Sequence, residues 1–239
     1  WMWPAKNDGE NSRLYKAVKE VSEFTCALGI NIPTGKDSLS MAQKYPDGKK
    51  VLAPGSVIIS AVGEVSNINK VVTPNLKTAP TSQLIYVPFS NGKLSIGGSS
   101  FGQIINSLGG NTPDTTPEIV VNAFNAVQEL IHENLVLAGH DVASGGLVTT
   151  LMEMTFPNKE GGASISFEKF EEEDIIKLLF NENPAVVLQV EDIHKVEKVL
   201  SKHKTSFIEV GNTTDTRNIK LTKDDWNLEL SIDDMRDIW

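Results

Sequence analysis

From residue 83 onward the sequence alternates between short apolar runs and longer segments with helical periodicity. Short β-branched runs are typical of buried strands, and apolar residues that recur every three or four positions are typical of helices. The alternation predicts helices packed against a sheet, in the α+β or α/β class. We expect strands at 84–88, 135–138, 163–167 and 185–190 and near Phe207 and Leu228, with helices from 117 and at 147–156, 172–180 and 193–203.

The helix that begins after Thr116 has the clearest start signal. A threonine hydroxyl can accept a hydrogen bond from the free amides of a first helical turn, and Pro117 suits the first helical position. Its buried face is predicted to hold Val120, Phe124, Val127 and Ile131.

The first 82 residues carry a different pattern. Residues 12–28 have helical spacing, and Cys26 within them is predicted to be a buried, inert thiol. Residues 45–50 indicate an exposed turn, and Val57 to Val62 form a β-branched run that predicts a strand buried on both faces. Residues 66–82 are polar and rich in Asn and Pro, which indicates a boundary between domains.

Composition limits the kinds of partner. With 22 basic and 31 acidic side chains the formal charge is −9, which disfavours binding to nucleic acid. It does not exclude phosphate ligands, because a bound divalent cation can supply positive charge. A single cysteine allows no intrachain disulfide and is consistent with the cytoplasm. No apolar run has transmembrane length and no signal peptide is visible. The start at Trp1, without an initiator methionine, suggests a piece of a longer protein.

A first candidate ligand site is the loop Gly35-Lys36-Asp37-Ser38-Leu39-Ser40-Met41. Backbone amides and an ammonium group can hold a phosphate together. The loop is not a P-loop, because Asp37 follows the lysine where that motif has Ser or Thr, and because its glycine spacing differs. An ordinary surface turn explains the local pattern equally well.

A second candidate is His140-Asp141-Val142-Ala143-Ser144-Gly145-Gly146-Leu147, between an expected strand and an expected helix. Ligands often bind where a strand ends beside a helix N-terminus. Asp141 could bind magnesium, and the glycines could let a phosphate approach the helix amides. Alternatively, Asp141 or Ser144 caps the helix and the glycines only make a tight turn.

Two further segments carry weaker signals. Gly97-Gly98-Ser99-Ser100 precedes a short expected helix and could hold a phosphate or allow close packing. Glu182 lies between an expected helix and an expected strand, where the end of a helix accounts for it as well as a functional role does.

Together these segments resemble the large, single-chain phosphoribosylformylglycinamidine synthase family. The resemblance rests on four segments in the family's order, and it extends from residue 1 to about residue 235. They are Trp1 to Pro4 followed by Gly9-Glu10-Asn11, residues 28–41 with the string Gly-Lys-Asp-Ser-Leu-Ser-Met, His140-Asp141 with Gly145-Gly146-Leu147, and Leu179 to Glu182.

The resemblance implies an aminoimidazole-ribonucleotide-synthetase-like fold, with a partial N-terminal half and a complete C-terminal α/β sandwich domain. The implied organisation has four parts. Residues 1–70 end the N-terminal half-domain, 71–82 form a linker, 83–215 form the C-terminal domain, and 216–239 extend toward a glutaminase domain.

The resemblance also implies an activity and its ligands. The family is an ATP-dependent carbon–nitrogen ligase in which ATP phosphorylates the amide oxygen of formylglycinamide ribonucleotide and ammonia from glutamine then displaces that phosphate. Asp141 matches a magnesium ligand, and Ala143, Ser144, Gly145 and Gly146 match residues near ATP or ADP. Ala143 and Ser144 replace the family's Ser-Asp pair, so a contact at Ala143 must use its backbone. The Lys36, Asp37 and Ser38 loop is expected to contact a phosphate-bearing ligand.

The expected partners are nucleotide and ribonucleotide substrates and the remaining domains of the same enzyme, with a homodimer as a further assembly. The piece alone is expected to be inactive. Alternatives are a non-catalytic assembly module and a related ATP-dependent synthetase of the same superfamily, in which the Gly-Lys-Asp-Ser-Leu-Ser-Met string is not expected.

Overall fold

The computed structural model describes residues 1–239, which form two compact units, Trp1–Ser66 and Asn67–Trp239. In unit 1, helix α1 (Glu10–Ala27) precedes a hairpin of β1 (Ala42–Lys44) and β2 (Lys50–Leu52), which pair antiparallel. Met2 forms isolated bridges with Ser38 and Ser56 and so connects the start of the chain to two later loops of this unit.

Two expectations for unit 1 are wrong. Cys26 is exposed, because α1 buries none of its residues within this unit. Val57 to Val62 form no strand and are exposed, with Val62 fully so. A strand needs a neighbour that pairs with its amides and carbonyls. The apolar patterns of α1 and of residues 57–62 therefore have no covering layer in this unit. The expected helix and the exposed turn at 45–50 are confirmed.

Unit 2 is built on a seven-stranded sheet in the order β4-β6-β3-β7-β5-β8-β9. All neighbouring strands are antiparallel except β5 and β8, which run parallel. The strands are β3 (Gln83–Pro88), β4 (Val136–Asp141), β5 (Gly162–Ser166), β6 (Ala185–Val190), β7 (Ile208–Thr214), β8 (Asn218–Lys223) and β9 (Trp226–Ser231). The helices are the 3-10 turn η1 (Ile68–Lys70), α2 (Ser100–Ile104), α3 (Pro117–His132), α4 (Gly146–Glu153), α5 (Ile175–Phe180), α6 (Ile193–Lys202) and α7 (Ile232–Ile238).

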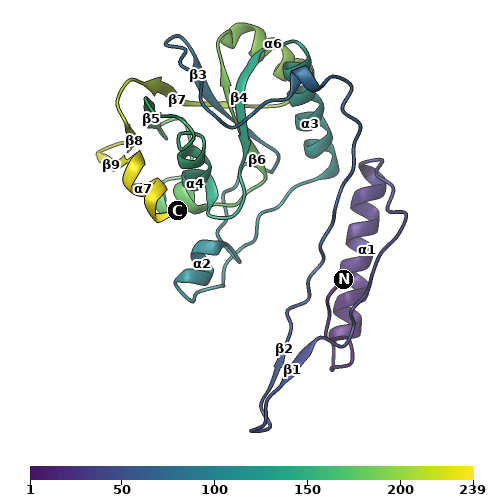
Figure 1. Ribbon diagram of the computed structural model, residues 1–239. Helices are drawn as coiled ribbons and strands as arrows, with labels where there is room; N and C mark the ends of the chain where they lie inside the picture. The colour runs from purple at the N-terminus through teal and green to yellow at the C-terminus, as the bar shows by residue number, and fades with distance from the viewer. The chain divides into compact units, whose positions relative to one another are not determined.

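The central strands are apolar on both faces, so helices cover both sides of the sheet (Figure 1). On β3, Ile85 and Val87 pack with α3 and α6, whereas Leu84 and Tyr86 pack with α4, α5 and α7. Alternate side chains of a strand point to opposite faces, which explains this division. The mixed sheet between two helical layers confirms the predicted fold class.

Most element predictions for unit 2 are confirmed, with some corrections. Thr116 caps α3 by accepting from the amide of Ile119. Val127 is buried as expected, but Phe124, expected on the same face, is 54% exposed. Ala123, Ala126 and Leu130 complete the buried face. The sequence did not indicate β8, which lies within residues 216–239, and this segment also supplies β9 and α7.

Tyr86 is a buried polar side chain in this core. Its hydroxyl has no hydrogen-bond partner, and burial raises the pKa of Tyr86 above the ordinary value for tyrosine. An unpaired buried hydroxyl costs about 1–3 kcal/mol. Tyr86 is therefore a position at which the fold gives up stability.

We expect Tyr86→Phe to raise the free energy of unfolding by about 1–3 kcal/mol at neutral pH, because it removes this hydroxyl. Above about pH 10 the unfolded chain loses a tyrosine proton that the folded chain keeps, so the stability of the unmodified protein falls as pH rises. The difference in free energy of unfolding between Tyr86→Phe and the unmodified protein should therefore increase with pH. Urea denaturation at about pH 8 and about pH 11 measures both effects. An advantage that stays constant between these pH values contradicts the explanation.

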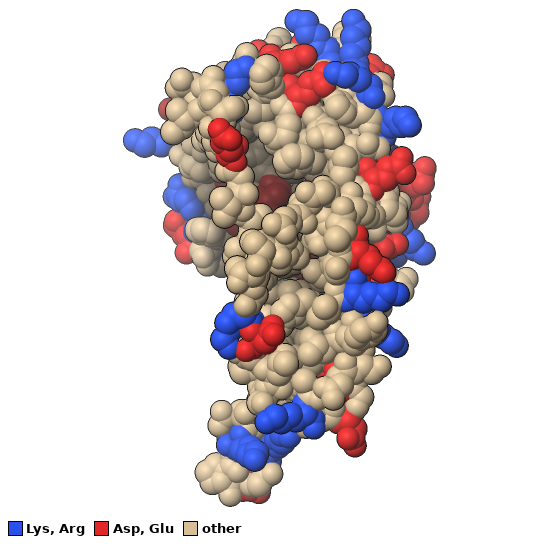
Figure 2. Space-filling view, turned by 90° about the vertical axis from the view of Figure 1, so that its right-hand side faces the viewer, with Lys and Arg blue, Asp and Glu red and all other residues tan.

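The surface carries charges of both signs. Side chains of Lys and Arg and of Asp and Glu are interspersed on the face seen in Figure 2, much of which is uncharged. This mixture differs from the continuous basic stripe typical of nucleic-acid binding. No helix is both long enough and apolar enough to cross a membrane.

Candidate functional site

Asp141 is the last residue of β4, and the turn that begins α4 follows it directly. Its side chain is 73% exposed, and Oδ1 lies 3.2 Å from Nδ1 of His140. The backbone carbonyl of Asp141 accepts from Oγ1 of Thr150, one turn into α4, at 3.1 Å. This bond connects the end of β4 to α4. The carboxylate of Asp141 takes no part in it and faces solvent beside the turn.

His140 extends this contact toward the other end of α4. Its Nε2 lies 3.2 Å from Oε2 of Glu153, whose Oε1 accepts from the indole Nε1 of Trp239 at 3.1 Å. Sequence analysis did not identify Glu153, because its contact depends on how α4 packs beside the end of β4. The imidazole of His140 thus lies between the carboxylates of Asp141 and Glu153.

The turn that follows Asp141 requires its two glycines. Gly145 has φ of 89° and Gly146 has φ of 78°, in the left-handed region that favours glycine. A Cβ on Gly146 would lie 2.6 Å from the backbone of Phe180 and 2.7 Å from that of Asn181. Neither Asp141 nor Ser144 caps α4, because the N-cap is Gly145, which has no side chain to accept from the first helix amides. The two glycines therefore form the expected tight turn, whereas the expected cap by Asp141 or Ser144 is not formed.

Ala143 and Ser144 lie on the exposed side of this turn. The amide of Gly146 donates to the carbonyl of Ala143 at 3.0 Å, which closes the turn. A methyl group can neither donate nor accept a hydrogen bond, so a ligand at Ala143 could form polar contacts only with its backbone.

Glu182 lies next to both glycine loops. Its Oε1 accepts from the amide of Gly145 at 2.9 Å and from the amide of Ser100 at 2.8 Å. The carboxylate therefore takes one of the amides that could have served an anionic ligand at α4. Sequence analysis noted Glu182 but not this role, because its partners lie 37 and 82 residues away.

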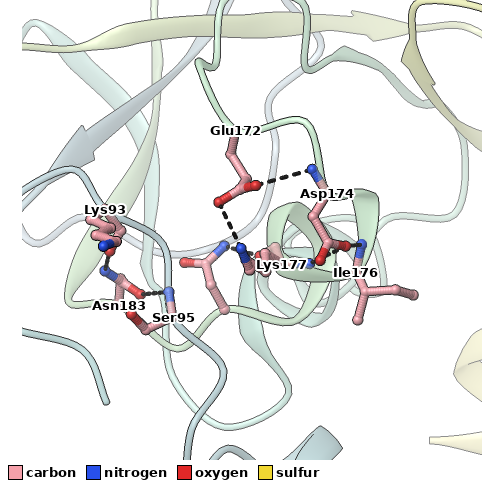
Figure 3. Close-up of polar contacts among 8 residues, drawn as sticks. Lys93, Ser95, Glu172, Asp174, Ile176, Lys177 and Asn183 are labelled. Carbon is pink, nitrogen blue, oxygen red and sulfur yellow. Dashed lines mark hydrogen bonds and ion pairs between the residues drawn. The ribbon is translucent and has the colours of Figure 1, made fainter. Parts of the chain in front are cut away.

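Asn183 holds the loop that leads to α2. Its Oδ1 accepts from the amide of Ser95 at 3.0 Å, and its Nδ2 donates to the carbonyl of Lys93 at 2.9 Å (Figure 3). The same Nδ2 lies 3.3 Å from Oγ of Ser90. Because Asn183 is fully buried, it acts as a fixed internal support for residues 90–95.

Close packing explains Gly97. Its amide donates to the carbonyl of Asn111 at 2.9 Å, and a Cβ on it would lie 2.5 Å from that oxygen. Ser99 caps α2 by accepting from the amide of Gly102. The geometry of residues 97–100 therefore favours packing over the alternative of a second phosphate cradle.

The other predicted ligand loop belongs to unit 1. Nζ of Lys36 contacts the carbonyl of Asp37 and lies 3.1 Å from Oγ of Ser38. Lys36 and Asp37 are exposed, and Ser38 is half-buried. The amide of Ser38 donates to the carbonyl of Trp1 at 2.8 Å, so a backbone hydrogen bond connects this loop to the start of the chain.

The residues around Asp141 suit a cation that arrives with its own ligands. The chain contains no group of three or more His, Cys, Asp or Glu side chains placed to hold a metal ion. Magnesium is commonly bound through one or two carboxylates, together with phosphate oxygens and water. A single exposed carboxylate fits that role and does not make a self-sufficient metal site.

Two family models match the chain. Residues 1–64 match the family described as FGAR-AT PurM_N-like domain, and residues 84–224 match the family described as AIR synthase related protein, C-terminal domain. The second match covers more than half of the chain and extends from the second residue of β3 to the end of β8.

Relatives of known sequence match over the whole chain. "Probable phosphoribosylformylglycinamidine synthase, chloroplastic/mitochondrial" from Arabidopsis thaliana is 39% identical over 100% of this chain and 17% of that protein. Phosphoribosylformylglycinamidine synthase from Homo sapiens is 34% identical over 100% of this chain and 18% of that protein. The chain thus spans less than a fifth of the length of these relatives.

Solved structures share the fold at low identity. "Structure of PurLQS from Thermotoga maritima" matches with a TM-score of 0.63 and 12% identity, over 97% of this chain and 36% of that one. "T. maritima PurL complexed with FGAR" matches with a TM-score of 0.62 and 12% identity, over 98% of this chain and 38% of that one. The chain therefore belongs to the AIR synthase related protein family, and its whole length is homologous to part of the large-type phosphoribosylformylglycinamidine synthases.

Proposed function

We propose that this chain is one part of an ATP-dependent ligase of purine biosynthesis, in which it binds a nucleotide with magnesium. The whole enzyme would convert formylglycinamide ribonucleotide, ATP and glutamine to formylglycinamidine ribonucleotide. The observation that carries this proposal is homology over 100% of the chain to proteins named for that synthase activity. Structural relatives described as PurL complexed with ATP, ADP and FGAR support the choice of ligands.

Asp141 would supply one carboxylate oxygen to magnesium. Its exposure and its place at the end of β4 leave that oxygen accessible. The backbone of Ala143, Ser144, Gly145 and Gly146 would lie beside the phosphates at the start of α4, where helix amides favour negative charge. Bound magnesium would neutralise part of the phosphate charge. In unit 1, Lys36 with Asp37 and Ser38 would contact a phosphate-bearing ligand.

We expect ADP with magnesium to bind this chain and Asp141→Ala to weaken binding by at least about tenfold, the effect of losing a charge-assisted ligand contact. Isothermal titration calorimetry measures both affinities. The matched control is Asp225→Ala, since Asp225 is also exposed and its side chain forms no hydrogen bond or ion pair. Equal affinities for the Asp141 and Asp225 variants would contradict the assigned role of Asp141. An unmodified chain that binds no ADP would contradict nucleotide binding by this part alone.

We also propose that the chain is inactive by itself. A cytoplasmic location is a separate proposal. No residue here is assigned to transfer the phosphoryl group or to release ammonia. Amidine formation by the purified chain, with formylglycinamide ribonucleotide, ATP and glutamine supplied, would contradict the proposed inactivity.

A non-catalytic assembly role is the second candidate. It is favoured by exposed apolar side chains in unit 1, among them Tyr15, Ile58 and Val62, and by a helix that buries none of its residues. Exposed apolar surface of this kind commonly marks an interface. Light scattering would reveal a homodimer, and the calorimetric titration would decide whether nucleotide binding accompanies it.

A further inference from the structure

Glu182 joins two loops that are far apart in the sequence. One oxygen of its carboxylate accepts from the amide of Ser100 at 2.8 Å and from the amide of Gly145 at 2.9 Å. Ser100 is the first residue of α2, and Gly145 is the N-cap of α4. A single side chain therefore ties together the starts of two helices.

The backbone on either side of Glu182 is firmly held. Asn181 is fully buried and bonds through Nδ2 to the carbonyls of Lys177 and Leu178. Asn183 is fully buried and bonds to the backbone of Lys93 and Ser95. Gly146 packs so closely on Phe180 and Asn181 that a Cβ has no room there. Glu182 thus projects from a rigid support at the base of both loops.

Charge strengthens the connection. A carboxylate that accepts from amides at helix starts forms charge-assisted hydrogen bonds and faces the positive ends of the helix dipoles. Glu182 is only half-buried, so its charge does not require full desolvation. A neutral side chain of the same shape would keep an acceptor oxygen but lose the charge.

We propose that Glu182 is a positioning residue that holds the turn after Asp141 against the start of α2. Its effect on nucleotide affinity rests on the proposed function, whereas its effect on the two loops does not. Without the carboxylate, the amides of Ser100 and Gly145 lose a shared acceptor, and the turn that places Asp141 becomes free to move away from α2. Glu182 acts here through Gly145 and need not touch the ligand.

Amide hydrogen exchange, followed by NMR without nucleotide, tests the connection directly. In Glu182→Ala, the amides of Ser100 and Gly145 should exchange at least about tenfold faster, as expected for losing a bond to a charged acceptor. Glu182→Gln, which keeps an acceptor, should give a smaller increase. Glu173→Ala is the matched control, because Glu173 is exposed and its side chain forms no hydrogen bond or ion pair.

The amide of Ser95 serves as an internal reference, because Asn183 holds it independently of Glu182. Its exchange should stay unchanged in every folded variant. If the amides of Ser100 and Gly145 exchange at the same rate in Glu182→Ala as in Glu173→Ala, the positioning role is overturned. If the alanine variant does not fold, the glutamine variant decides by the same comparison.

Calorimetric titration with ADP and magnesium provides the second readout. Positioning predicts affinity at least about tenfold weaker in Glu182→Ala than in Glu173→Ala, with partial recovery in Glu182→Gln. Unchanged binding in Glu182→Ala would overturn the proposal, because the carboxylate would then not affect the site. Tighter binding would also overturn it, because the carboxylate would then compete with the ligand for the Gly145 amide. If the unmodified chain binds no ADP, the proposed function fails at this site and the exchange rates alone decide the role of Glu182.

Discussion

Replacing Gly146 with alanine is expected to lower the free energy of unfolding of unit 2 by about 2–5 kcal/mol. Left-handed backbone costs a residue with a Cβ about 1–2 kcal/mol. Overpacking adds about 1–3 kcal/mol, since the new Cβ would lie 2.6 Å from the backbone of Phe180. The atoms it meets belong to main chain that Asn181 and Asn183 hold in place, so they cannot easily move aside.

Urea denaturation followed by far-ultraviolet circular dichroism measures the effect. Gly92→Ala separates its two causes, because Gly92 has φ of 77° and nothing lies within 4 Å of its Cβ position. That control should show the conformational cost without the overlap. Equal losses for the two variants would mean that the start of α4 does not pack against residues 180–181 as described. Weaker ADP binding by Gly146→Ala at a temperature where it remains folded would extend the same argument to the proposed site.

Replacing Asn183 with alanine is expected to destabilise unit 2 by about 2–4 kcal/mol. The substitution leaves the amide of Ser95 and the carbonyl of Lys93 without their partners (Figure 3). An unsatisfied buried polar group costs about 1–3 kcal/mol. Ser90 and Ser95 are both buried, so water does not readily replace the lost amide.

Asn91→Ala is the comparison for this variant. Asn91 is exposed, and its side chain bonds only to the Asp114 carboxylate, so its loss should cost about 0.5 kcal/mol or less. Chemical denaturation of both variants gives the difference, and amide exchange at Ser95 locates it. A loss for Asn183→Ala no larger than that for Asn91→Ala would contradict the support assigned to Asn183.

Where a pattern is local and its partners lie nearby, the sequence was sufficient. The N-cap at Thr116 depends on an amide three residues away, and it is present as predicted. The apolar runs that became β3 and β6 were found because both faces of these central strands are buried, which leaves a continuous apolar signal. The strand β8 was not predicted, although its residues alternate as in a half-buried strand, because Ile219 and Leu221 are its only apolar residues and leave a weak signal.

Where burial depends on a layer supplied by other parts of the fold, apolar patterns predicted burial that the structure does not show. Cys26 and Val57 to Val62 have apolar spacing, yet they are exposed because nothing in unit 1 covers them. Phe124 fits the apolar stripe of α3 but lies outside the buried face, which the smaller Ala123 and Ala126 occupy where the helix approaches the sheet. Periodicity identifies a helix, but its neighbours choose which side is buried.

By itself, then, the sequence determined the order of strands and helices from β3 to β7, the family resemblance and the turn in which Asp141 lies, because local propensity and short motifs encode these features. Only the tertiary structure decided that Glu182 would join the loops at Ser100 and Gly145 and that Asn183 would support residues 93–95. Those contacts span 37 to 90 residues along the chain. They exist because the sheet brings the end of α5 beside both loops. Contacts between residues so far apart in the sequence leave no local sequence pattern.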